Sequence, residues 1–193
     1  VTALMEAKSA MEVIVAAPTA GACATFPGAL LAAIDEVGAS DEMSARALLT
    51  GGLIGVFITN RSSFAAEVGG CQAETGAGAA MAAAALVELA GGSAARSLSA
   101  ASQSLQNVLG LICDPVGNRV EAPCLGRNVS GAANALSCAN MALAGYDHVI
   151  PFDEVVDAHR QVSEMMAREL RCTGLGGLAI TPTAQRIELT LKR

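Results

Sequence analysis

The sequence lacks tryptophan and is poor in aromatic residues, since four Phe and one Tyr make up only 3% of its 193 residues. Sheets favour β-branched and aromatic side chains, so this scarcity argues against a sheet-based fold. Small and aliphatic residues take their place, in a composition that is 52% hydrophobic. Because small side chains let helices pack closely, the composition predicts a compact all-α domain.

Basic residues are also scarce. Twelve Lys and Arg against eighteen Asp and Glu give a net charge of −6, and no basic run occurs. Nucleic-acid phosphates require clustered Lys and Arg, so we expect no nucleic-acid partner. The two lysines, Lys8 and Lys192, both lie near the ends of the chain. This argues against pyridoxal phosphate, which needs a lysine in its pocket for the Schiff base.

Long uninterrupted hydrophobic runs are missing as well. The charge-free stretch 13–34 is broken by Pro and Gly, and the stretch 128–146 contains Asn and Ser. Neither is typical of a membrane span, and the start of the chain has no signal-peptide pattern. We therefore expect no membrane partner and a cytoplasmic location. The chain begins at Val1, within a predicted helix, and we expect it to be a fragment or one half of a split protein.

Glycine and proline punctuation predicts a series of helices. Pro27 suits the first position of a helix that ends near Gly38, while Ser40 and Ser93 are expected to cap two further helices. The other predicted helices cover 71–90, 127–144 and 152–170, followed by a short terminal helix. Residues 13–15 are the only expected extended piece. No repeat or long linker divides the chain, so residues 1–193 are predicted to form a single domain.

Three of the six cysteines lie beside Gly or Pro, where the backbone can approach a bulky inorganic group. They are Cys71, Cys113 and Cys124, with spacings of 42 and 11 residues. These spacings match neither the paired CxxC of zinc ribbons nor the tight run of ferredoxins. Spacing alone therefore leaves two interpretations open, a shared metal or cluster and three buried thiols.

Longer strings around these cysteines identify a family. "GGCQAETGAGAAMAAAALVELAGG", "LGLICDPVGNRVEAPCLGRN" and "TGLGGLAITPT", with "APTAGA" upstream, resemble the alpha chain or alpha domain of bacterial iron–sulfur-dependent L-serine dehydratases. The resemblance covers the chain from about Met11 onward. It implies that Cys71, Cys113 and Cys124 hold a [4Fe-4S] cluster with one iron free of protein thiolate. Such an iron is a Lewis acid that helps the serine hydroxyl leave, giving pyruvate and ammonia.

The resemblance also implies partners and further site residues. The family has an N-terminal segment and a beta chain or domain that this chain lacks, so we expect a homo- or hetero-oligomer. Glu74, one turn after Cys71, is a candidate acid/base or hydrogen-bond acceptor, and the alternative, which we favour over direct acid/base work, is an ordinary buried carboxylate satisfied by backbone or Arg. The main base is expected in the beta part, so the chain alone should not turn over serine. The candidates for binding the substrate carboxylate are Thr19, Ser63, Arg127 and Asn128.

One departure leaves the substrate open. Residues 61–66 read RSSFAA, where the family tends to read Asn-x-Ser-x-Ser-Gly. A changed hydrogen-bonding group can alter selectivity by orders of magnitude. A cysteine desulfidase, or a dehydratase of another small hydroxy-amino acid, therefore remains an alternative to the serine enzyme. A helical interaction domain without a cluster is the alternative that involves no catalysis.

The remaining polar and sulfur-containing residues have simpler expected roles. Cys23, Cys138 and Cys172 are predicted to be structural, with a fourth thiolate as the alternative for Cys172. Asp114 is expected to form a turn before Pro115. Both histidines, His148 and His159, are expected at the solvated surface.

Overall fold

The computed structural model describes residues 1–119 and 121–191, and within these residues it forms helices and no β-strand. The predicted all-α fold is confirmed. The α-helices are α1 (Thr2–Ser9), α2 (Thr25–Val37), α3 (Asp41–Arg61), α4 (Ala66–Gly69), α5 (Ala77–Leu89), α6 (Ala94–Gln106), α7 (Cys124–Leu143), α8 (Phe152–Met165) and α9 (Pro182–Leu191). A π-helical turn, Gln72–Gly76, precedes α5, and short 3₁₀ turns cover Val116–Asn118, Arg168–Leu170 and Gly177–Ile180.

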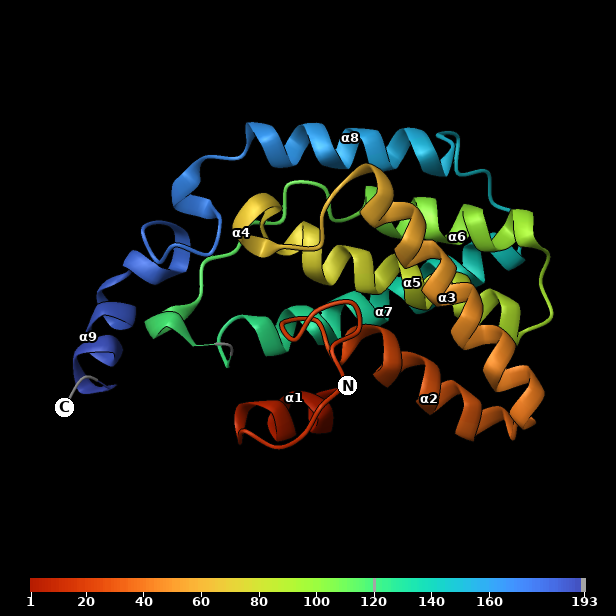
Figure 1. Ribbon diagram of the computed structural model, residues 1–193, viewed down its shortest axis with the longest axis horizontal. Coiled ribbons are helices and arrows are strands. Elements are labelled where there is room, and N and C mark those ends of the chain that lie inside the picture. The colour runs from red at the N-terminus through yellow and green to blue at the C-terminus, as the bar shows by residue number, and fades with distance from the viewer. Residues whose placement is uncertain (120, 192–193) are drawn as a thin grey trace.

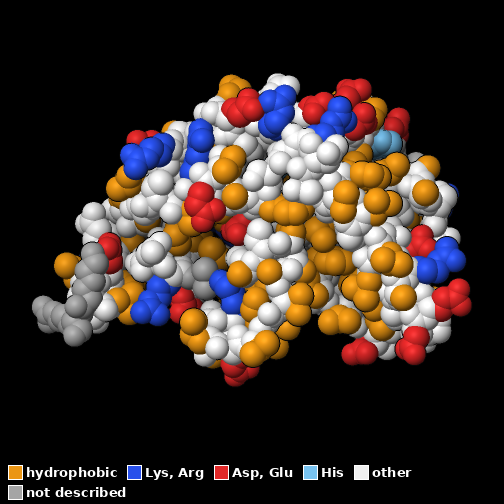
Figure 2. Space-filling view, in the orientation of Figure 1, with side chains coloured by type: hydrophobic (Ala, Val, Ile, Leu, Met, Phe, Trp, Pro, Cys, Tyr) orange, Lys and Arg blue, Asp and Glu red, His pale blue; other side chains and the backbone are white. Residues whose placement is uncertain are grey.

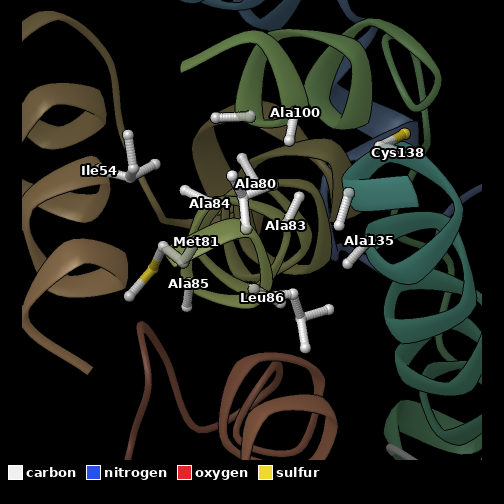
Figure 3. Close-up of a cluster of buried hydrophobic side chains, with 14 of the residues drawn as sticks. Ile54, Ala80, Met81, Ala83, Ala84, Ala85, Leu86, Ala100, Ala135 and Cys138 are labelled. Carbon is white, nitrogen blue, oxygen red and sulfur yellow. The ribbon is translucent and has the colours of Figure 1, made fainter. Parts of the chain in front are cut away.

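Helix α5 is the centre of the domain. Its residues from Ala77 to Val87 are all buried, because α2, α3, α6 and α7 pack around it. Figure 3 shows α5 nearly end-on, with Ile54 of α3, Ala100 of α6 and Ala135 of α7 directed toward it. Alanine has the highest helix propensity, and its small side chain lets four neighbours approach one helix. The alanine-rich composition thus builds the core that the aromatic residues do not provide.

The helix starts follow the expected capping residues. The Ser40 hydroxyl accepts a hydrogen bond from Met43 N at 3.3 Å at the start of α3. Ser93 caps α6 in the same way through Arg96 N. Gly38 ends α2 with a left-handed φ of +60°, a conformation that glycine adopts without strain. These local signals were therefore sufficient to place helix boundaries within a few residues.

Two predictions about local structure are wrong. The segment 13–15 forms no strand and lies in an exposed loop between α1 and α2, with Val13 fully exposed. The helix predicted over 152–170 ends at Met165, because Met166 adopts an extended conformation and 3₁₀ geometry follows. An extended segment with no neighbouring strand has no partner for its backbone groups, so it stays a loop.

The C-terminal segment extends from one end of the helical bundle (Figure 1). Helix α8 runs along the bundle against α6 and α4, and the chain then passes through two 3₁₀ turns to α9. Helix α9 packs on the turn Val116–Asn118. The segments around Cys113 and Cys172 therefore meet at this end of the molecule. In the part of the chain described, no helix combines the length and hydrophobicity that a bilayer crossing requires.

Candidate functional site

Three thiols from distant parts of the chain meet at the end of the bundle where α5 begins. Cys71 precedes the π-helical turn, Cys113 lies in the loop after α6, and Cys124 is the first residue of α7. Their exposed fractions are only 2%, 2% and 6%. The thiols of Cys113 and Cys124 both lie close enough to the sulfur of Cys71 to shift its pKa. The arrangement brings together the three cysteines on which the sequence prediction rested.

The contacts among the thiols make their acidities unequal. Hydrogen bonds from Cys113 and Cys124 lower the pKa of Cys71 to about 3, and the nearby Arg127 charge acts in the same direction. The pKa of Cys113 is raised, first by its hydrogen bond with Cys172, and that of Cys124 is raised by its hydrogen bond with Cys71. One thiolate is therefore stabilised by two neighbouring protonated thiols. Binding of a metal to all three would release the remaining protons.

Arg127 holds the cysteine-bearing segments together from the first turn of α7. Its guanidinium donates to Cys71 Sγ at 3.4 Å and to the carbonyl oxygen of Ile112 at 2.8 Å. It also pairs with Asp114, with Nη2 2.7 Å from Oδ1. The Arg127 side chain is only 15% exposed, so the charge lies against the thiols in a largely desolvated position. Positive charge at this place stabilises thiolates, as does the N-terminal end of α7 that carries Cys124.

Asp114 is not simply a turn residue, as the sequence had suggested. It is 2% exposed, and besides its ion pair with Arg127 it accepts a hydrogen bond from Leu178 N at 2.7 Å. Gly177 has a φ of +60° and no Cβ, which lets its backbone lie directly against the carboxylate. Asp114 therefore links the Cys113 loop, α7 and the glycine-rich C-terminal segment. Sequence proximity to Pro115 concealed this role, because all the partners are distant along the chain.

Gln72, which follows Cys71, was not singled out from the sequence. It is completely buried, and its amide nitrogen donates to Ser163 Oγ at 2.8 Å and to the carbonyl oxygen of His159 at 3.2 Å. Its amide oxygen accepts from Gly110 N at 2.7 Å, and its backbone N–H donates to Leu111 O at 2.9 Å. Gln72 thereby links the backbone next to Cys71 both to α8 and to the loop that leads to Cys113.

Glu74 lies beside the loop that contains Thr19. The Thr19 hydroxyl donates to Glu74 Oε1 at 2.8 Å and accepts a hydrogen bond from Ala22 N at 3.2 Å. A Cβ at Gly21 would lie 2.5 Å from Glu74 Oε2, so the absence of a side chain there makes room for the carboxylate. Burial raises the pKa of Glu74, while the hydrogen bond from Thr19 opposes that effect. Glu74 is also the only residue from 71 to 80 that is partly exposed rather than buried.

The other expected substrate-binding residues are engaged within the chain. Asn128 is fully buried: its amide nitrogen donates to the carbonyl oxygens of Gly21 and Cys124, and its amide oxygen accepts from the Thr25 hydroxyl. Ser63 accepts from Ala65 N at 3.0 Å, just before α4. Asn128 thus ties the Thr19 loop to the Cys124 helix. Both residues remain predictions as substrate ligands, and these contacts give each a positioning role.

The surface position predicted for His159 is wrong. Its exposed fraction is 0%, its Nδ1 lies 2.8 Å from the Ser62 hydroxyl, and its Nε2 has no hydrogen-bond partner. The polar residues around it in the sequence disguised one buried position on the amphipathic helix α8. Cys23 and Cys138 are buried as expected, and burial raises the pKa of Cys138 to about 11. Cys172 differs from them, because it is partly exposed and contacts Cys113.

A cavity of the domain lies away from the three thiols. An apolar cavity of about 500 Å³ between α3, α6 and α8 is lined by residues such as Phe57, Leu98 and Phe152, and none of the cysteines lines it. Within the described residues, no three Cys, His, Asp or Glu side chains are arranged around one point as ligands of a single metal ion. Ligands of a four-iron cluster each bind a different iron, however, so a single-ion arrangement is not what such a group requires.

The donor set fits an iron–sulfur cluster in its chemistry. Three convergent, buried thiols supply soft ligands of the kind that iron–sulfur clusters take. Arg127 and the N-terminal end of α7 provide positive charge against the negative charge of a thiolate-bound cluster. The surrounding hydrogen bonds from Gln72 and Asp114 hold the segments in place independently of the thiols.

Comparison with known proteins shows the family to which the chain belongs. The family model described as "Serine dehydratase alpha chain" matches residues 1–179. The chain belongs to this family. The L-serine dehydratase alpha chain of Peptoniphilus asaccharolyticus is 48% identical over 182 residues, which are 94% of this chain and 62% of that relative. The probable L-serine dehydratase alpha chain of Bacillus subtilis is 46% identical over 183 residues, 95% of this chain and 61% of the relative.

A third member of the serine dehydratase alpha-chain family shows the same extent of similarity. The probable L-serine dehydratase alpha chain of Latilactobacillus sakei is 43% identical over 186 residues, which cover 96% of this chain and 89% of that relative. The resemblance inferred from the cysteine-containing strings is therefore confirmed at the level of the family. This chain spans about three fifths of the length of the Peptoniphilus and Bacillus relatives.

Proposed function

We propose that this chain is the cluster-holding alpha part of an L-serine dehydratase, with Cys71, Cys113 and Cys124 as the ligands of a [4Fe-4S] cluster. The observation that carries the proposal is the convergence of the buried thiols of Cys113 and Cys124 on Cys71. When bound, the cluster supplies Lewis acidity at the iron that lacks a protein thiolate. Loss of water from serine, and its conversion to pyruvate and ammonia, is the reaction that we assign to the complete enzyme.

The chain's own residues then have distinct tasks. Arg127 positions Cys71 and the Cys113 loop, because its guanidinium contacts the Cys71 sulfur, the Ile112 carbonyl oxygen and the Asp114 carboxylate. Glu74 carries a carboxyl group whose raised pKa suits it to hold a proton, and Thr19 orients that group. The backbone amides of the Pro18–Ala22 loop, together with Thr19, lie beside Glu74 and are the expected contact for the substrate carboxylate. Their position follows from the Asn128 hydrogen bond to Gly21.

A beta chain or domain is the proposed partner, and it is expected to supply the main base. Three of the relatives are named as alpha chains, which supports a second chain in the working enzyme. In the described part of this chain, the buried histidine contacts Ser62 and lies on α8, and the other histidine is on the loop before it. Neither contacts the thiols, so a proton acceptor from elsewhere is consistent with the arrangement.

The test is anaerobic reconstitution with iron and sulfide, with and without the beta partner. We expect iron near four per chain, brown colour with broad visible absorbance, and pyruvate formation from serine only when the partner is present. Cys71→Ala, Cys113→Ala and Cys124→Ala should each lose the colour. Cys138→Ala is the matched control, because Cys138 is equally buried but packs in the core away from the three thiols.

The outcomes separate the alternatives. Substrate comparison with serine, threonine and cysteine decides between a serine dehydratase and a lyase for another small amino acid, which the altered segment 61–66 keeps in question. Preferential turnover of cysteine would overturn the assignment of serine. Protein that stays colourless after anaerobic reconstitution would favour a helical interaction domain and refute the cluster.

A further inference from the structure

Cys172 lies beside the three thiols but is not one of the proposed cluster ligands. The segments around Cys113 and Cys172 form an isolated parallel β-bridge, in which Cys113 N donates to Leu170 O and Cys172 N donates to Cys113 O, both at 2.8 Å. The side chain of Cys172 packs against the cluster of Ala66, Cys71 and Cys113. Cys113 lies directly opposite Arg171 in this bridge, and Cys172 is the next residue, joined to Cys113 through its own backbone N–H.

This pairing suits a disulfide. Paired extended segments lie about 4.7–4.9 Å apart, and α-carbons joined by disulfides are usually about 4.4–6.8 Å apart. Cys172 is the residue after the bridged position, and its backbone N–H donates to the carbonyl oxygen of Cys113 at 2.8 Å, so the two backbones already lie close enough for a disulfide to be considered. The chain passes through Cys172 with a φ of +62°.

Access differs among the four thiols. Cys71, Cys113 and Cys124 are at most 6% exposed, whereas Cys172 is partly exposed. A dissolved oxidant can therefore reach Cys172 first. Once Cys172 is modified, the thiol in contact with it is that of Cys113. Access and proximity together select this pair over a bond between Cys71 and either of its neighbours.

We propose that Cys113 and Cys172 form a reversible disulfide in the cluster-free chain, by exchange with a small-molecule disulfide such as oxidised glutathione. The Cys172 thiolate attacks one sulfur of glutathione disulfide, and the S–S bond breaks to release one glutathione thiolate. The Cys113 thiolate then attacks the Cys172 sulfur of the mixed disulfide and releases the second. The two protein thiols lose two electrons, glutathione disulfide gains them, and the two protein protons pass to the released glutathione thiolates.

The consequence for cluster binding rests on the proposed function. A Cys113 sulfur held in a disulfide is not available as a thiolate ligand, so the disulfide and the cluster exclude each other. The disulfide would thus mark chain that has lost its cluster and keep it inactive until it is reduced. The disulfide itself follows from the geometry and does not depend on the cluster assignment.

Tryptic digestion can identify which cysteines are linked, because trypsin leaves each of the six cysteines in a separate peptide. Cys71, Cys113, Cys124 and Cys172 fall in peptides 62–96, 97–119, 120–127 and 172–186. Cluster-free chain, purified without oxygen, is incubated in glutathione buffers of graded oxidising strength, alkylated in acid and digested. We expect peptides 97–119 and 172–186 to appear linked as the buffer becomes more oxidising, with an intact mass two hydrogens lower, and to separate again with dithiothreitol.

Two variants and an iron assay complete the experiment. Cys172→Ser keeps the three proposed ligands and should abolish the linkage, whereas Cys138→Ser should behave like the unmodified chain. Oxidised chain should take up little iron on reconstitution, and dithiothreitol should restore uptake; Cys172→Ser should retain uptake after the same oxidation. Linkage of peptide 62–96 to 97–119 or 120–127, a stable glutathione adduct on Cys172, or no linkage would overturn the proposal.

Failure of the two proposals can be told apart. If the Cys113–Cys172 linkage forms but the fully reduced chain binds no iron, the disulfide stands and the cluster assignment is refuted. If the reduced chain binds iron but no linkage forms in any of the buffers, the cluster assignment stands and the disulfide proposal is refuted.

Discussion

At the scale of single residues, the burial of His159 gives the domain a distinct response to pH. Burial lowers the pKa of His159 below its ordinary value of 6.5, because the protonated ring is desolvated there, while a hydrogen bond with the Gln72 backbone opposes this effect. The unfolded chain therefore takes up a proton at a higher pH than the folded chain does. The contribution of His159 to stability is complete above pH 6.5 and is lost as the pH falls through the folded pKa.

We expect His159→Gln to reduce the loss of stability on acidification. One titrating group changes the free energy of unfolding by at most about 1.4 kcal/mol per pH unit. Urea unfolding of both proteins over a pH series measures the difference in their free energies of unfolding. Taking this difference removes the pH dependence that both proteins share, including the contribution of opposite sign that arises from the raised pKa of Glu74. His148→Gln is the control, because His148 is partly exposed. Parallel pH profiles for His159→Gln and the original chain would contradict the prediction.

The residues of the site show what sequence could and could not indicate at this scale. The cysteines stood out because Gly and Pro flank them and because the strings around them resemble a family. Gln72 and His159 did not, since nothing in a local pattern marks a polar side chain whose partners lie 38 to 97 positions away. Their roles depend on which helices meet, and that information lies in tertiary packing rather than in spacing.

At the scale of helices, adjacent glycines in α3 face opposite surroundings. A Cβ at Gly51 would lie 2.5 Å from ring atoms of the buried Phe26 and 3.1 Å from the carbonyl oxygen of Met81, at the contact of α3 with α2 and α5. A Cβ at Gly52 would meet nothing within 4 Å. The two positions share one helix, so they separate the effect of packing from that of helix propensity.

We expect Gly51→Ala to destabilise the domain by about 1–3 kcal/mol, because the added methyl group overpacks a close contact. Gly52→Ala should instead stabilise it by about 0.5–1 kcal/mol, because alanine restricts the unfolded chain and favours the helix. Denaturant unfolding of the two single variants measures these changes in the free energy of unfolding. Equal effects of the same sign would show that α3 does not pack on Phe26 as described.

Helix boundaries were predictable where a local signal determines them, as at Ser40, Ser93 and Gly38. The π-helical turn after Cys71 was not, since the sequence 71–90 reads as one continuous helix of small residues. The turn occurs where the backbone must also supply Gln72 to α8 and to the Cys113 loop. Tertiary contacts, rather than propensity, therefore set the local geometry at the site.

At the scale of the whole molecule, a row of exposed hydrophobic side chains lies on the outer face of α3. Leu49, Leu53, Val56 and Phe57 are between 42% and 73% exposed, and they recur at helical spacing. Figure 2 shows hydrophobic side chains gathered over the part of the surface where α3 runs. Apolar surface of this kind favours association, because burying it removes it from water.

We therefore expect the isolated chain to self-associate through α3, and Leu53→Glu to weaken that association. Burial of one leucine contributes about 1.5–3 kcal/mol, so its loss should lower the association constant by about tenfold or more. Sedimentation velocity over a concentration series measures the change. Val13→Glu introduces the same charge at a fully exposed residue away from α3, and it should leave the association unaltered. Equal weakening by both variants would show that charge, not the α3 surface, controls the assembly.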